Sequence, residues 1–144
     1  METLLAKAIN IALQAQKDEV DLQGMPYAGH IMRVMGAGKT VDEKIVGALH
    51  DLVEDTDFTL DDLLAQGFPQ YIVDAVGCLT KQSDDEPYDS YIERVKSNPL
   101  AVAVKINDLT DNMDIRRYHT LTDVDVDRMR KYLKVYHELV NMRK

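Results

Sequence analysis

A histidine and several acids interrupt an apolar helical pattern near the middle of the sequence. In Val46–Asp55 (VGALHDLVED), leucines and valines recur as on a buried helix, and among them stand His50, Asp51, Glu54 and Asp55. Burying such groups without partners costs on the order of several kcal/mol. A divalent cation removes that cost, so the pattern predicts a metal site.

Two further segments carry polar side chains that could bind a metal. Asp108 and Asn112 are four residues apart and therefore share one helix face, and His30 follows the segment GMPYAG. Taken singly, each histidine is more typical of a buried structural residue. The ordered set His30, His50-Asp51 and Asp108 offers two imidazoles and two carboxylates, which suit Mn²⁺, Fe²⁺ or Zn²⁺ with positions left for water.

Three longer segments resemble one family of enzymes. They are Gly24–His30 (GMPYAGH), Ala48–Thr59 (ALHDLVEDTDFT) and Val104–Met113 (VKINDLTDNM). Together they resemble the HD-domain metal-dependent phosphohydrolases, and among these the (p)ppGpp hydrolase domain of RelA/SpoT-type enzymes and the stand-alone small alarmone hydrolases. The resemblance extends over nearly the whole chain, and HDxxEDTD is its most specific part.

The resemblance implies an all-helical HD-type domain that binds one metal ion. Mn²⁺ is the implied metal, with other divalent metals as alternatives, and its implied ligands are His30, His50, Asp51 and Asp108. The implied reaction is the release of pyrophosphate from the 3′ position of ppGpp or pppGpp by a water that the metal activates.

The same resemblance assigns roles around the metal. Glu54 and Asp55 match the catalytic acid pair of the family, one carboxylate of which would orient the water and take its proton. The implied substrate contacts are Asn112, Arg128 and Tyr132. Arg128 and Tyr132 are four residues apart and share a helix face; alternatively they are a solvent-facing base and a core residue.

The sequence departs from the family pattern at several positions, most clearly in one acidic stretch. Asp18–Leu22 (DEVDL) is acidic where phosphate-binding bases are typical, and Gln16 replaces a frequent histidine. A related hydrolase for another nucleotide or phosphorylated metabolite is therefore an alternative, and a non-catalytic nucleotide sensor is a third. The pair Glu54 and Asp55 favours an enzyme, because a pure binder does not need it.

The elements that must position these residues are predicted to be helical. Apolar residues recur at helical spacing along nearly all 144 residues, which predicts one all-α domain (1–144), a compact helical bundle of seven or eight helices. Helix starts are indicated by Thr40, Thr59, Asn98 with Pro99, and Thr122.

Three helices carry specific expectations. The helix that begins after Thr40 is expected to continue through Val53. The run Leu100–Ile106 could be a strand by its β-branched residues, but the cap before it favours a buried helix. On the last helix, the residues expected to face the core are Met129, Leu133, Tyr136 and Val140.

The composition of the chain limits the classes of binding partner that are expected. The net charge of −8, from 25 acids and 17 bases, argues against broad binding to nucleic acid or to an anionic membrane. A single cysteine excludes an internal disulfide, and neither a secretory signal nor a long apolar run is evident, so the cytoplasm is the expected compartment. The expected partner is a small phosphorylated nucleotide, and a homo-oligomer remains compatible with the sequence.

Overall fold

The computed structural model describes residues 2–144, and this part of the chain is all-α, as the sequence predicts. It contains no β-strand, and eight of its α-helices have six or more residues. In chain order the elements are α1 (Leu4–Ala15), α2 (Ala28–Ala37), α3 (Val41–Leu49), the single turn α4 (Leu52–Asp55), α5 (Leu60–Ala65), α6 (Gln70–Cys78), α7 (Tyr88–Lys96), α8 (Pro99–Asn112), the 3₁₀ turn η1 (Ile115–Arg117) and α9 (Asp123–Met142). None of the described helices combines the length and the apolar character needed to cross a membrane.

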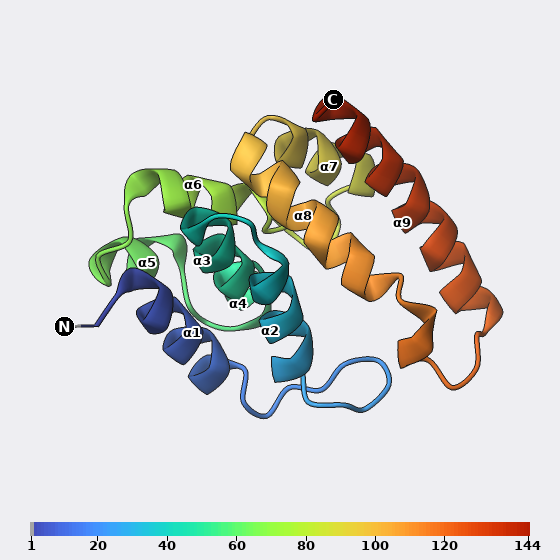
Figure 1. Ribbon diagram of the computed structural model, residues 1–144, viewed down its shortest axis with the longest axis horizontal. Helices are drawn as coiled ribbons and strands as arrows, with labels where there is room; N and C mark the ends of the chain where they lie inside the picture. The colour runs from blue at the N-terminus through green and yellow to red at the C-terminus, as the bar shows by residue number, and fades with distance from the viewer. Residues whose placement is uncertain (1) are drawn as a thin grey trace.

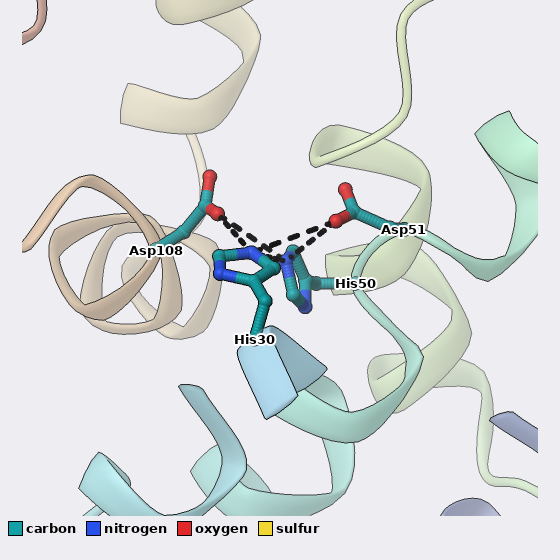
Figure 2. A group of neighbouring side chains, drawn as sticks. All are labelled: His30, His50, Asp51 and Asp108. Carbon is teal, nitrogen blue, oxygen red and sulfur yellow. Dashed lines mark hydrogen bonds and ion pairs between the residues drawn. The ribbon is translucent and has the colours of Figure 1, made fainter. Parts of the chain in front are cut away.

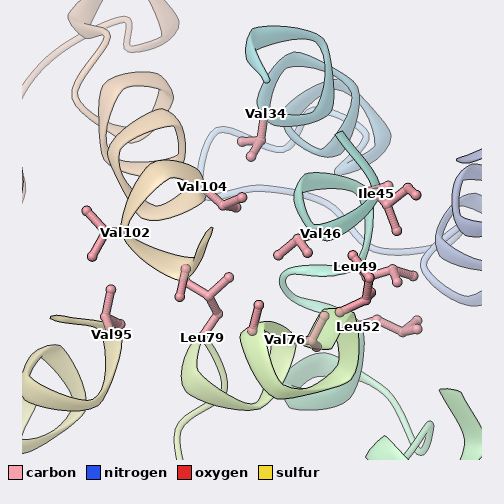
Figure 3. Packing of buried hydrophobic residues seen from close by; sticks show 14 of the residues in the cluster. Val34, Ile45, Val46, Leu49, Leu52, Val76, Leu79, Val95, Val102 and Val104 are labelled. Carbon is pink, nitrogen blue, oxygen red and sulfur yellow. The ribbon is translucent and has the colours of Figure 1, made fainter. Parts of the chain in front are cut away.

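Helix α3 lies at the centre of the bundle. It packs against α1, α2, α6 and α8, while α8 also packs against α7 and α9 (Figure 1). Figure 3 shows the core where these helices meet, with Val46 and Leu49 of α3 close to side chains from α6 and α8. Both residues are fully buried. The polar residues around His50 therefore extend from the most enclosed helix of the fold.

The predicted helix starts are confirmed. The side chains of Thr40, Thr59, Asn98 and Thr122 each accept a backbone N–H of the helix that follows, which satisfies a donor that has no partner within the helix. Leu100–Ile106 lies within α8 and is largely buried, so the helical alternative for this run is correct.

The prediction of one helix from Thr40 through Val53 is wrong. Helix α3 ends at Leu49, and α4 begins at Leu52 after a residue, Asp51, whose backbone angles are φ −107° and ψ −2°. The His50 Nδ1–H donates to the carbonyl oxygen of Gly47 at 2.6 Å, so the side chain supplies part of the hydrogen bonding at this helix end. The break allows His50 and Asp51 to face the same point.

The predicted core stripe of the last helix is also wrong in part. Leu133 is 50% exposed, whereas Val135 and Leu139 are buried and Tyr132 packs against the core. Apolar residues occur on two adjacent stripes of this helix, and sequence spacing alone does not rank them. Contact with α8 selects the stripe that is buried.

Candidate metal centre

The four predicted metal ligands converge on one point, and Figure 2 shows their side chains turned toward one another. They come from α2, from the break between α3 and α4, and from α8, and one donor atom of each lies within 4.8 Å of the others: His30, His50, Asp51 and Asp108. Both histidines and Asp108 are buried. Two imidazole nitrogens and two carboxylate oxygens at this spacing fit a divalent transition metal.

The donor atoms of the group lie close together. His30 Nε2 lies 2.9 Å from Asp108 Oδ1, and His50 Nε2 lies 2.9 Å from Asp51 Oδ2. The two Nε2 atoms are 3.3 Å apart. Each imidazole thus presents Nε2 to the centre, while its Nδ1 makes a hydrogen bond on the outer side, which is the arrangement of a metal-binding histidine.

Charge within the cluster shifts the pKa of each group. Burial lowers the pKa of His30 and of His50, but the charges and hydrogen bonds of Asp51, Asp108 and Asp111 outweigh burial and raise both above the usual value. Burial raises the pKa of Asp108, yet the charge of Lys105 and the two histidines hold it well below its ordinary range. The acids of the cluster therefore favour the protonated form of both imidazoles.

Metal binding should be coupled to proton release. A metal needs neutral imidazoles, and both histidine pKa values lie above the ordinary 6.5 in the metal-free protein. We expect Mn²⁺ binding at pH 7 to release protons, and affinity to fall about tenfold per pH unit for each proton displaced as the pH is lowered. Calorimetry in two buffers of different ionisation enthalpy measures this release. An identical binding heat in both buffers would contradict it.

The raised pKa values of His30 and His50 also make the stability of the metal-free protein depend on pH, and they favour the folded state at low pH. Because the folded-state pKa of each histidine is raised, the stabilisation is fully present below pH 6.5 and is lost as the pH rises through the folded-state pKa.

Asp111 is a candidate positioning residue that sequence reasoning missed. Its Oδ2 lies 2.6 Å from His30 Nδ1, and its carboxylate also accepts hydrogen bonds from Arg33 and Arg117. Asp111 is one turn after Asp108 on α8, so helical spacing from a predicted ligand was the available signal. This carboxylate fixes the tautomer and the orientation of His30.

Replacing Asp111 by asparagine should weaken Mn²⁺ binding about 10–100-fold, because the amide is a poorer acceptor for the His30 N–H and carries no charge. The fold should persist, since the side chain of Arg33 is half exposed and Arg117 keeps its ion pair with Asp21. Asp114→Asn is the matched control, because Asp114 loses its bond to Arg116 without touching a histidine. Equal Mn²⁺ dissociation constants for the two variants would exclude the positioning role.

Two further side chains contact the ligand carboxylates. The hydroxyl of Tyr27 donates to Asp51, and Lys105 Nζ lies 2.9 Å from Asp108 Oδ2. Burial and the charge of Asp51 raise the pKa of Tyr27, so this phenol stays a hydrogen-bond donor. Lys105 contacts Oδ2 of Asp108 and leaves Oδ1 directed to the centre, whereas the Tyr27 hydroxyl contacts the same oxygen of Asp51, Oδ2, that faces His50.

A cavity adjoins the centre and contains most of the remaining predicted residues. Tyr27 lines it, as do four of the residues predicted from the sequence, namely Asp55, Asn112, Arg128 and Tyr132. Asn112 Nδ2 also donates to Asp108 Oδ1 at 3.1 Å, which connects the cavity wall to the cluster. The structure thus brings the predicted substrate contacts to one side of the metal centre.

Glu54 lies elsewhere. Its side chain is exposed, is not part of the cavity lining, and accepts the backbone N–H of Lys81 at 2.9 Å. Asp55 is therefore the member of the predicted catalytic pair that faces the cavity.

When the sequence is compared with models of known protein families, no family model matches.

Proposed function

We propose that this protein is a metal-dependent phosphohydrolase of the HD type that releases pyrophosphate from the 3′ position of (p)ppGpp. The observation that carries the proposal is the convergence of two buried histidines and two aspartates beside a cavity lined by Asp55, Asn112 and Arg128. A site that only binds a metal does not need a further carboxylate, that of Asp55, or the positive charge of Arg128 in an adjoining cavity.

The donor set fits a divalent metal held by His30, His50, Asp51 and Asp108. A bound Mn²⁺ supplies an acidified water and stabilises negative charge on phosphoryl oxygens. The protein holds these ligands in place through Asp111 on His30, the Gly47 carbonyl on His50 and Tyr27 on Asp51.

The side chains of the cavity supply the remaining functions. Asp55 is the proposed acceptor for the proton of the attacking water, because its carboxylate faces the cavity near Asp51. Asn112, held by Asp108, offers its carbonyl oxygen and an N–H to a nucleotide, and Arg128 offers a guanidinium to phosphate. The ring of Tyr132 provides a flat surface on the same helix face.

A hydrolase for another phosphorylated metabolite is the second candidate. Three acids line the cavity, Glu19, Asp21 and Asp55, and this charge disfavours a ligand with as many phosphates as ppGpp unless cations accompany it. A less highly charged phosphate ester would bind such a cavity more easily.

The test is an assay of metal-stripped protein with ppGpp, with and without Mn²⁺, that measures pyrophosphate and GDP. Release of both products only with Mn²⁺ is the expected result. No turnover of ppGpp with Mn²⁺ demonstrably bound would reject the alarmone substrate, and a panel of phosphorylated metabolites would then identify the second candidate by a faster turnover.

A further inference from the structure

The loop between α1 and α2 extends toward the 3₁₀ turn η1, and one ion pair joins the two segments (Figure 1). Arg117 Nη2 of η1 donates to Asp21 Oδ2 of the loop at 2.8 Å, although the two residues are 96 positions apart in the chain. Both side chains are largely enclosed, with exposed fractions of 9% for Asp21 and 18% for Arg117. Water and salt screen such a pair much less than an exposed one, so it can hold the two segments together.

The other terminal nitrogen of Arg117 contacts the outer partner of the metal centre. Arg117 Nη1 donates to Asp111 Oδ2 at 2.9 Å and to the backbone carbonyl oxygen of Asp111 at 3.0 Å. Asp111 Oδ2 is the same oxygen that lies 2.6 Å from His30 Nδ1. The guanidinium therefore bridges Asp21 and Asp111, and a continuous chain of contacts connects the loop with a predicted metal ligand.

Asp21 also organises the loop itself. Its second carboxylate oxygen, Oδ1, accepts the backbone N–H of Gln23 at 2.8 Å and that of Met25 at 3.0 Å, and its own N–H donates to the carbonyl oxygen of Met25 at 2.8 Å. Gly24 permits the turn, because its φ of +79° lies in the left-handed region that favours glycine. Burial raises the pKa of Asp21, but the hydrogen bonds from Arg117 and from the backbone of the turn outweigh burial and hold this pKa below its usual value.

The end of the same loop contacts a second predicted ligand. The backbone N–H of Tyr27 donates to the carbonyl oxygen of Glu19 at 2.9 Å, which closes the base of the loop, and the Tyr27 hydroxyl donates to Asp51. His30 lies in the first turn of the helix that follows. The loop is thus connected to two ligands that come from different parts of the fold.

We propose that Arg117 and Asp21 are positioning residues of the metal centre, which act through Asp111 on His30. Asp21 holds Arg117, and Arg117 holds the carboxylate that orients the imidazole, so the loop belongs to the framework that fixes the ligand geometry. One acid of the stretch Asp18–Leu22 thereby has a role other than contact with phosphate. The inference rests on metal binding at the centre, which is part of the proposed function, but not on the identity of the substrate.

Two substitutions test this role by the affinity of the metal-stripped protein for Mn²⁺ alone, measured by calorimetry. Arg117→Lys keeps the positive charge but loses the planar fork that bonds both carboxylates. We expect it to raise the Mn²⁺ dissociation constant about tenfold, at the low end of the range for a lost outer partner. Asp21→Asn keeps an oxygen for the backbone bonds of the turn but loses the ion pair, and it should raise the dissociation constant about threefold.

A double-mutant cycle separates this positioning role from a general loss of structure. If Arg117 acts through Asp111, Arg117→Lys should change the dissociation constant by less than about twofold in the Asp111→Asn background. With Zn²⁺ as a diamagnetic probe, the ¹⁵N resonance of His30 Nδ1 reports the hydrogen bond to Asp111. This resonance should shift in Arg117→Lys. Additive effects on affinity, or an unchanged resonance, would overturn the inference.

Asp18→Asn is the matched control for Asp21→Asn, since Asp18 is an exposed acid of the same loop. Equal Mn²⁺ dissociation constants for these two variants, or an unchanged affinity in Arg117→Lys, would also overturn the inference. If the wild type bound Mn²⁺ and the variants showed the expected losses, but no phosphorylated substrate were hydrolysed, the proposed function would fail and the inference would stand. A wild type without affinity for Mn²⁺ would overturn both.

Discussion

Replacing Asp51 by alanine should abolish metal-dependent pyrophosphate release. Asp51 Oδ2 lies 2.9 Å from His50 Nε2 and is one of only four donor atoms that converge in the described residues 2–144. Loss of an outer partner of a metal ligand already costs about 10–100-fold in affinity or activity, so loss of a ligand should exceed ~100-fold. Pyrophosphate release at saturating Mn²⁺ and the Mn²⁺ dissociation constant measure the effect.

The substitution also leaves the Tyr27 hydroxyl without its acceptor, which costs about 1–3 kcal/mol of stability. Circular dichroism must therefore show that the variant is folded at the assay temperature. Asp57→Ala is the matched control, because Asp57 is an exposed acid of the same segment and makes no contact with the cluster. If Asp51→Ala retained the activity of Asp57→Ala, the metal centre would not be the active site.

Replacing Lys105 by methionine should produce the largest change in stability. Lys105 is buried on α8, its Nζ lies 2.9 Å from Asp108 Oδ2, and it lies 5.1 Å from the centre of the Tyr91 ring. Methionine fills a similar volume but removes the positive charge that contacts Asp108 Oδ2. Removing one partner of a buried ion pair costs about 3–5 kcal/mol, so the metal-free variant should lose stability of that order.

The loss should be smaller when metal is bound, because a cation at the centre compensates the charge of Asp108. Urea denaturation with a chelator and with Mn²⁺ measures both values. Lys134→Met is the control, since Lys134 is an exposed lysine of α9 and its loss should change stability by less than about 0.5 kcal/mol. A loss for Lys105→Met that equals the control, or that Mn²⁺ does not reduce, would show that the pair is not coupled to the metal centre.

The local pattern of the sequence determined the helix class and four of the helix starts. Thr59 and Thr122 form capping boxes with acids three residues later, and Asn98 caps a helix that begins with proline. These interactions join residues three positions apart, so their geometry depends on little else. That His50 and Asp51 need partners was predictable for a related reason: a histidine and acids within an apolar helix require a partner wherever the helix packs.

Only the tertiary structure decided which side chains of the site contact one another and how they are oriented. Asp111 and His30 are separated by 81 residues, and Gln16 and Asp55 by 39, so no local pattern predicts either contact. The break between α3 and α4 was not predicted either, and it matters because a continuous helix would place the side chains of His50 and Asp51 about 100° apart. Packing of α2 and α8 around α3 brings the donors to one point, and that arrangement is a property of the folded core rather than of any segment.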